Sequence, residues 1–163
     1  MAATVIRNAD EGENLWFAGG GVFTLKVSAE DTGGMFFLLE DHVVRGKTTP
    51  LHRHQNEDEL IYVLDGEMIA HMGGNEQRVG KGGLVFFPRG IAHSFLVTSE
   101  TAHLLVIQTP GTGERFYREA SDPVTSATAD AARPPDLTRL REAAARSQTV
   151  ELLGPPPFTA RQR

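Results

Sequence analysis

Short apolar runs separated by glycine, asparagine and proline fill the chain from Trp16 to Gln108. Most of these runs are too short for a typical helix, and turn-forming residues return at intervals of roughly 8 to 12 positions. Runs rich in Val, Ile, Leu and Phe at this spacing are typical of an all-β domain. The predicted strands are Val22–Val27, Met35–Val44, Leu60–Leu64, Met68–Met72, Leu84–Phe87, Ser94–Thr98 and His103–Gln108.

Two groups of glycines mark turns between these runs. The segment Met72-Gly73-Gly74-Asn75 supplies the positive φ angles that a tight hairpin requires. The three glycines at positions 80, 82 and 83 precede the run at Leu84 and leave no room for side chains. The sequence therefore predicts a hairpin at the first group and a sharp corner of a barrel at the second.

The composition changes after Pro110, where Ala, Asp, Pro, Ser and Thr replace the apolar runs. The stretch Ser121–Pro135 has no apolar periodicity and is predicted to be a surface linker. Asp136 is a suitable N-cap for one helix that reaches about Arg146, and the prolines at 155–157 end regular structure. We therefore predict one β-barrel with N-terminal strands over residues 1–112. Residues 113–163 then hold a linker, a short C-terminal helix and a proline-rich tail that is not an independent domain.

Composition and charge exclude several classes of function. A length of 163 residues suits one domain, and a net charge of −5 with dispersed Lys and Arg does not favour nucleic acid. The chain has neither the roughly 20 apolar residues of a membrane span nor the apolar core of a secretory signal. We therefore expect a cytoplasmic protein with no nucleic-acid or membrane partner. Because cysteine is absent, any metal must be held by nitrogen and oxygen.

The stretch from Gly46 to Gly66 carries the most informative spacing, Gly-x5-His-x-His-x4-Glu-x6-Gly. Alternate residues of a strand share a face, so His52 and His54 can direct two imidazoles to one point inside a barrel. Glu59 begins the next run, and antiparallel pairing after a short loop brings its carboxylate back beside the histidines. The sequence predicts that these three side chains converge.

Residues 82–93 provide a fourth ligand through the order Gly-x5-Pro-x-Gly-x2-His, which ends at His93. Three imidazoles and one carboxylate suit divalent first-row ions and leave positions open for water or substrate. The predicted cofactor is one divalent transition metal ion per chain, chosen from Ni, Co, Mn, Fe, Cu and Zn. The predicted ligands are His52, His54, Glu59 and His93.

These two segments resemble the paired motifs of the cupin superfamily, and the resemblance extends over residues 22–108. The first motif matches at every fixed position, whereas the second has Val97 where the family often has asparagine, a residue that is not a ligand. The resemblance implies a double-stranded β-helix, or jelly-roll, barrel. The Glu11–Phe17 lead, the Asp58–Gly66 run and the helical tail are similar to small bacterial single-domain quercetin 2,3-dioxygenase-like cupins.

Other polar residues near these motifs receive structural interpretations. Arg53 is expected to point away from the metal by strand alternation and to pair with a carboxylate at the barrel rim. Glu57 and Asp58 are predicted to be solvated surface carboxylates. The remaining histidines, which lack the motif spacing, are predicted to be hydrogen-bonded structural residues. They are His42, His71 and His103.

Aromatic residues offer candidates for a substrate pocket. Tyr62 and Phe95 are weak pocket candidates, and Phe95 shares the inward face with His93. Simple core packing is the alternative for both side chains. Trp16 and Phe17 precede the barrel and either cover an opening or pack against a partner subunit.

Three functions stay open at this level. The resemblance implies a metal-dependent dioxygenase that cleaves a flavonol such as quercetin, or a related enolic aromatic molecule, with O2 as second substrate. Glu59 would then be both ligand and catalytic base for the enol proton. The alternatives are an oxygen-independent polyketide cyclase or sugar-type isomerase, and a non-catalytic cupin that binds a small ligand. A homodimer is expected, because a small barrel has sheet edges to protect and proteins resembling this chain often form dimers.

Overall fold

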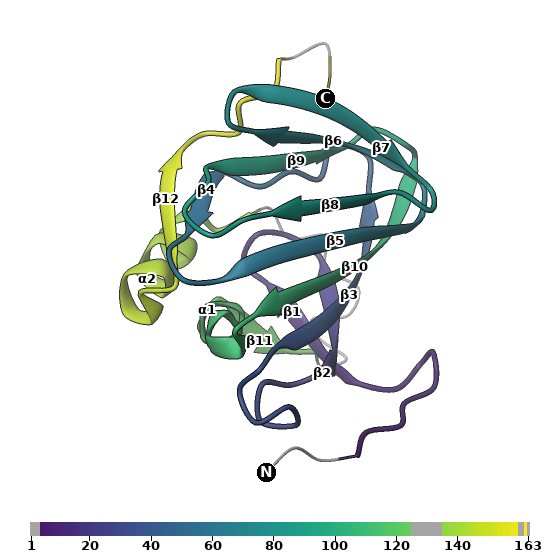
Figure 1. Cartoon of the computed structure of the whole chain (residues 1–163), viewed down its shortest axis with the longest axis vertical. Helices are drawn as coiled ribbons and strands as arrows, with labels where there is room; N and C mark the ends of the chain where they lie inside the picture. The colour runs from purple at the N-terminus through teal and green to yellow at the C-terminus, as the bar shows by residue number, and fades with distance from the viewer. Residues whose placement is uncertain (1–3, 125–134, 160–161, 163) are drawn as a thin grey trace.

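The computed structural model of the chain describes residues 4–124, 135–159 and 162. Two antiparallel sheets enclose a shared apolar core (Figure 1). The larger sheet has the order β11-β1-β2-β3-β10-β5-β8, and the smaller has the order β12-β4-β9-β6-β7. The predicted all-β jelly-roll class is confirmed.

Each of the seven predicted runs overlaps a strand of these sheets. The larger sheet is built from β1 (Glu13–Phe17), β2 (Val22–Val27), β3 (Phe37–Val44), β5 (Asp58–Asp65), β8 (Leu84–Phe87), β10 (Thr101–Thr109) and β11 (Ser121–Pro123). The smaller sheet is built from β4 (Leu51–His54), β6 (Glu67–Met72), β7 (Asn75–Gly80), β9 (His93–Val97) and β12 (Val150–Gly154). The helical elements are η1 (Gly111–Gly113), α1 (Glu114–Glu119) and α2 (Leu137–Ser147).

Both predicted turns are present. Met72 pairs with Asn75 across the β6–β7 hairpin, and the two glycines between them have φ angles of 57° and 84°. At the corner before β8, Gly82 has a φ of 79°, and a Cβ on Gly83 would lie 2.7 Å from the Val79 side chain. Residues with side chains would therefore strain both turns.

The inner face of the larger sheet is organised in three levels, because inward residues of β3, β10 and β5 lie directly opposite one another. We number the levels along β10. Level one joins Phe37, Gln108 and Glu59; level two joins Leu39, Val106 and Ile61; level three joins Asp41, Leu104 and Val63. Polar side chains thus occupy both ends of a face whose middle level is apolar.

The region after Pro110 contains more regular structure than predicted. The linker prediction for Ser121–Pro135 is wrong at its start, because β11 forms there and pairs with β1. Residues 125–134 of that stretch lie outside the described part of the chain. The helix prediction is confirmed, since the Asp136 carboxylate accepts a hydrogen bond from Arg139 N at 3.0 Å. Helices α1 and α2 pack together at one end of the sheets (Figure 1).

Strand β12 was not predicted, and it affects the candidate site directly. It pairs with β4, so that Val150 lies opposite His54 and Leu152 lies opposite His52. The C-terminal segment therefore completes the sheet that carries three of the predicted metal ligands, two of them on the neighbouring strand β4. No helix in the described ranges has the length and apolar character needed to cross a membrane.

Candidate metal centre

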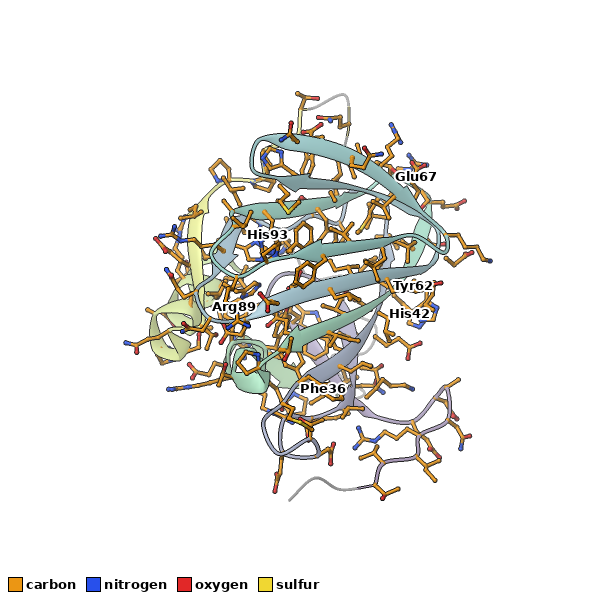
Figure 2. All side chains as sticks on the ribbon, viewed as in Figure 1. Phe36, His42, Tyr62, Glu67, Arg89 and His93 are labelled. Atoms are coloured by element: carbon orange, nitrogen blue, oxygen red, sulfur yellow. The ribbon has the colours of Figure 1, made fainter. Side chains whose placement is uncertain are left out.

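Four predicted ligands converge inside the barrel, and their ligand atoms all lie within 4.8 Å of one another. All four side chains are buried, and Figure 2 shows His93 within the barrel interior. Strand β4 provides two histidines, β5 provides the carboxylate and β9 provides the third histidine. We call these residues, His52, His54, Glu59 and His93, the His/Glu cluster.

The strand pairings explain why the cluster forms. His52 lies opposite His93 across β4 and β9, with ring centroids 4.3 Å apart. The short loop after β4 crosses to the other sheet, where Glu59 enters level one. Its Oε2 lies 3.3 Å from His54 Nε2, and its Oε1 lies 3.8 Å from His93 Nε2. The cluster therefore links the two sheets at one end of the barrel.

Hydrogen bonds fix the orientation of two of the imidazoles. His52 Nδ1 lies 2.8 Å from the carbonyl oxygen of Pro50, and His93 Nδ1 lies 2.9 Å from that of Ile91. A carbonyl only accepts, so each Nδ1 carries the proton and each Nε2 keeps a lone pair. Such hydrogen bonds are the usual outer support of a metal-binding histidine.

Two buried ring nitrogens in the cluster have no hydrogen-bond partner among the described residues. They are His93 Nε2 and His54 Nδ1. A buried nitrogen without a partner is costly, and a bound ion removes that cost for any lone pair that faces it. The donor set of three imidazoles and one carboxylate also suits a divalent first-row ion. The residues present therefore fit a transition metal.

The electrostatics favour the protonation states that a metal requires. Burial, together with the neighbouring His93 and His54, lowers the pKa of His52 to about 3. Burial also lowers the pKa of His93. Burial alone would raise the pKa of Glu59, but the hydrogen bond with His54 opposes this effect and the pKa is lowered. Neutral imidazoles and an ionised carboxylate are the forms that bind divalent ions.

Known proteins support this description. Residues 40–108 match the family model described as the cupin domain, and this range contains all of the His/Glu cluster. The chain belongs to the cupin superfamily. This cupin is 25% identical over 122 residues to quercetin 2,3-dioxygenase of Bacillus subtilis (strain 168). That match covers 75% of the chain but 36% of the enzyme, so the chain spans about a third of this relative's length.

Solved structures of other proteins have a similar fold. The structure of KdgF from Halomonas sp. has a TM-score of 0.57 at 15% identity, covering 67% of this chain and 94% of that chain. At this identity the likeness concerns the fold alone. The structure of the polyketide cyclase RemF from Streptomyces resistomycificus has a TM-score of 0.50 at 27% identity. The match covers 67% of this chain and 80% of the RemF chain.

Gln108 is a residue of the cupin site that the sequence interpretation missed. Its side-chain nitrogen donates to Glu59 Oε2 at 2.5 Å and lies 3.2 Å from His54 Nε2. The same nitrogen lies 3.4 Å from the Tyr117 hydroxyl on α1. A signal was present, because Gln108 shares strand parity with Leu104 and Val106 on an inward face of β10 that is otherwise apolar.

An aromatic ring supports the cluster from the other side. Phe87 on β8 stacks on His93 with centroids 4.2 Å apart and an interplanar angle of 14°. Phe87 is 1% exposed and lies opposite Glu59 across β5 and β8. It therefore restrains the His93 ring and excludes water from that side.

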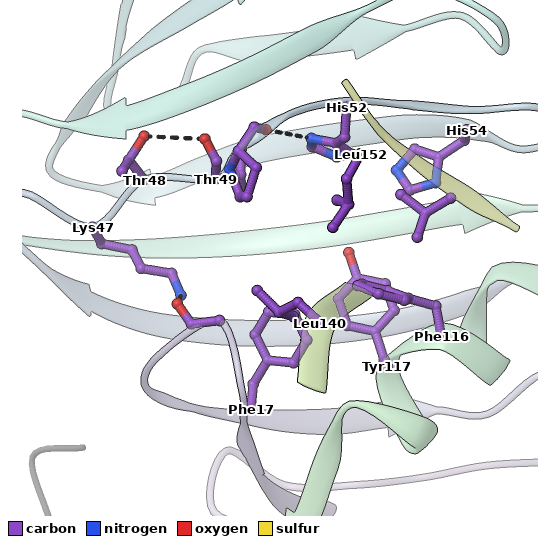
Figure 3. Close-up of a pocket in the computed structure, with 13 residues that line it drawn as sticks. Phe17, Lys47, Thr48, Thr49, His52, His54, Phe116, Tyr117, Leu140 and Leu152 are labelled. Carbon is purple, nitrogen blue, oxygen red and sulfur yellow. Dashed lines mark hydrogen bonds between the residues drawn. The ribbon is translucent and has the colours of Figure 1, made fainter. Parts of the chain in front are cut away.

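A cavity beside the cluster has two lobes, each of about 50 Å3. Both lobes are lined by Phe17, Lys47, Thr49, His52 and Tyr117. Figure 3 shows the lobe that is also lined by Leu140 of α2 and Leu152 of β12. On this measure a water molecule needs about 10–15 Å3, so each lobe has room for a few waters.

The pocket predictions have mixed outcomes. Phe95 lines the second lobe and stays a candidate substrate contact. The prediction for Tyr62 is wrong, because its side chain is 36% exposed on the outer face of β5 (Figure 2). Glu59, Ile61 and Val63 are alternate residues of β5 and all three are buried. Tyr62 has the opposite parity and therefore points outward. Phe17 borders the cavity, which fits the predicted role of covering an opening of the barrel.

The carboxylate predictions near the motif are partly wrong. Glu57 is 1% exposed rather than solvated, and its Oε1 accepts a hydrogen bond of 2.5 Å from the Thr112 hydroxyl. Asp58 lies at the surface but forms an ion pair of 2.7 Å with Arg89. Arg53 behaves as predicted, because it points away from the cluster and pairs with Glu151 of β12 at 2.8 Å.

The other three histidines lie apart from the His/Glu cluster. His103 shares a hydrogen bond of 2.5 Å with Glu40, and the His42 ring stacks on the His103 ring at 3.9 Å. A separate, partly exposed group on the outer face of β3 and β10 is formed by Glu40, His42 and His103. His71 lies 3.7 Å from Glu76 on the β6–β7 hairpin.

Proposed function

We propose that this cupin is a metal-dependent dioxygenase that cleaves a flavonol or a related enolic aromatic small molecule, with O2 as second substrate. The observation that carries the proposal is the buried His/Glu cluster beside a cavity with aromatic walls. The similarity to the Bacillus subtilis quercetin 2,3-dioxygenase supports the substrate class.

The His/Glu cluster would hold one divalent transition metal ion. Such an ion would supply Lewis acidity to an enolic oxygen and a redox-capable centre for reaction with O2. Ni, Co, Mn, Fe, Cu and Zn all suit the ligand set, and availability selects among them.

Glu59 has a second role in the proposal as the base that takes the enol proton. Its lowered pKa keeps the carboxylate ionised, so that it can accept a proton. Gln108 holds Oε2 through its amide, whereas Oε1 faces His93 at 3.8 Å. Fixing one oxygen keeps the carboxylate plane constant while the other oxygen faces the cluster.

The cavity walls position the substrate and limit its size. Phe17, Phe95 and Tyr117 offer apolar faces to a planar ring system. A three-ring flavonol is larger than the few waters that each lobe holds. Its binding therefore requires wall side chains such as Phe17 to shift.

Oxygen uptake on addition of quercetin tests the proposal directly. The protein is loaded in turn with each candidate ion, its metal content is measured, and uptake is followed with an electrode. We expect uptake with at least one redox-capable ion, and we expect Glu59→Gln to remove turnover while its melting temperature stays close to that of the parent. The matched control is Glu76→Gln on β7, which should keep full activity. Full activity in Glu59→Gln would contradict its role as base.

A second candidate function is an oxygen-independent metal-dependent cyclase, favoured by the similarity to the polyketide cyclase RemF. It would use the same cluster with zinc as Lewis acid. Turnover of a polyketide-type carbonyl compound by zinc-loaded protein under strict anaerobiosis would favour this function. Loss of turnover without oxygen would favour the dioxygenase.

We also propose that the chain forms a homodimer. Tyr62, Leu84 and Phe86 place exposed apolar side chains together on the outer face of β5 and the edge strand β8. Sedimentation equilibrium should give twice the chain mass, and a monomer mass at micromolar concentration would contradict the proposal.

A further inference from the structure

The cavity has a charged group at the end remote from the His/Glu cluster. In the larger sheet, Glu59 occupies level one and Asp41 occupies level three, four residues further along the strands. At about 3.3 Å per residue, these levels are roughly 13 Å apart. Asp41 lines the same cavity lobe as Glu59.

The opposite wall repeats this arrangement. His52 and Lys47 belong to one segment that runs beside β9, where Val97 N donates to Lys47 O and His52 lies opposite His93. Lys47 lines both lobes of the cavity and its ammonium lies 5.5 Å from the centre of the Phe17 ring (Figure 3). Each wall therefore carries a cluster residue at one end and a charged side chain at the other.

Asp41 is an unusual carboxylate because its neighbours across the strands are Phe23 and Leu104. Among the described residues, no hydrogen bond reaches its side chain. Burial raises the pKa of Asp41 to about 6, and the charge of Lys47 opposes that rise only in part. A carboxyl group placed in an apolar wall without a partner is costly for the fold. This cost suggests that Asp41 has a role in binding.

Lys47 is held in place and keeps bonding capacity. Its ammonium donates to the carbonyl oxygens of Gly19, at 2.7 Å, and Gly20. An ammonium has three N–H groups, so one donor stays free among the described contacts. Lys47 and Asp41 interact electrostatically, but within the described ranges they form no direct ion pair. Both side chains line the same cavity lobe and neither satisfies the other with a direct ion pair.

We propose that Asp41 and Lys47 form a second binding subsite, which takes a hydroxyl group of the substrate at the end remote from the His/Glu cluster. A hydroxyl donates one hydrogen bond and accepts others, so it bonds to the Asp41 carboxylate and accepts from the Lys47 ammonium. The Tyr117 side chain lines both lobes of the cavity. The subsite selects polyhydroxylated ring compounds over compounds that carry only the enol group. This inference rests on the proposed function for its ligand class.

The test compares two ligands and two variants in metal-loaded protein under anaerobic conditions. Quercetin carries the enol hydroxyl and further ring hydroxyls, whereas 3-hydroxyflavone carries the enol hydroxyl alone. Dissociation constants are measured through quenching of the single tryptophan, Trp16. Asp41→Leu removes the subsite and suits its apolar neighbours, and Asp41→Asn keeps a weaker hydrogen-bonding group. The matched control is His42→Leu, at the next position of β3 on the outer face.

The parent protein and His42→Leu should bind quercetin at least about 10-fold more tightly than 3-hydroxyflavone, the effect of one charge-assisted hydrogen bond. In Asp41→Leu this ratio should fall to near one, with an intermediate ratio in Asp41→Asn. Melting temperatures at or above that of the parent exclude misfolding as the cause. An unchanged ratio in Asp41→Leu would overturn the subsite, even if quercetin-dependent oxygen uptake supports the proposed function. A protein that binds neither ligand would overturn both, and the expected ratios without oxygen uptake would retain the subsite and refute the dioxygenase.

Discussion

Gln108 donates a hydrogen bond of 2.5 Å to Oε2 of Glu59, and both side chains are buried. The two residues lie opposite each other on β10 and β5, at the level of Phe37. A neutral amide is well suited to this position because it orients a carboxylate without competing for its charge. Gln108 therefore acts on the metal centre through Glu59.

Replacing Gln108 tests this role. Gln108→Leu should weaken metal binding or turnover about 10- to 100-fold, the usual effect of losing an outer hydrogen bond to a ligand. Titration with a competing chelator measures the affinity. Gln77→Leu makes the same change at an exposed position of β7 and should leave the affinity unaltered. Equal affinities in both variants would refute the role.

The stability of the metal-free protein should depend on pH through His52. The folded pKa of His52 is about 3, below its ordinary value of 6.5. The unfolded chain therefore binds more protons between these values, and the stability of metal-free protein falls as the pH drops through this window. The slope from this group is about 1.4 kcal/mol per pH unit. Melting temperatures at pH 7, 6, 5 and 4 should fall more steeply for the parent than for His52→Asn.

Asp41 should act on stability with the opposite sign. Its folded pKa of about 6 exceeds its ordinary value of 3.8, so the folded protein binds more protons between these values. Stability then falls as the pH rises from 4 to 6. Asp41→Asn should therefore stabilise the protein by about 2 to 3 kcal/mol at pH 7.5 and by much less at pH 4. Urea unfolding at the two pH values measures the difference. An equal effect at both values would show that Asp41 has no raised pKa.

The C-terminal strand should be required for the metal centre. Val150 of β12 is 6% exposed and lies opposite His54, whereas Leu153 on the same strand is 41% exposed. Val150→Asp buries a charge and should lower the melting temperature and the metal affinity together. Leu153→Asp makes a similar change at the surface and should do neither. If Val150→Asp retains parent affinity, β12 does not support β4.

The strands and the cluster were predictable because both depend on local pattern. Alternation places His52 and His54 on one face, and the motif spacing adds Glu59 and His93. The same alternation argues against Tyr62, which has the opposite parity to Glu59. Parity applied to β10 would have identified Gln108.

Other features depend on contacts between distant segments. Strand β12 is short and is followed by prolines, so only its pairing with β4 reveals it as a strand. Glu57 stands in a loop where alternation gives no information, and the Thr112 hydroxyl that binds it is 55 residues away. The Lys47 ammonium is held by a turn at Gly19 and Gly20 that precedes it by 28 and 27 residues.

Anomalous diffraction from crystals of metal-loaded protein tests the central claim most directly. Data collected at the absorption edge of bound cobalt should give one strong peak per chain among His52, His54, Glu59 and His93. The ligand distances should be about 2.0 to 2.2 Å, as is usual for nitrogen and carboxylate oxygen ligands of such ions. A peak at the outer group of Glu40, His42 and His103 alone, or no ordered peak in metal-loaded crystals, would contradict the assignment of the metal centre.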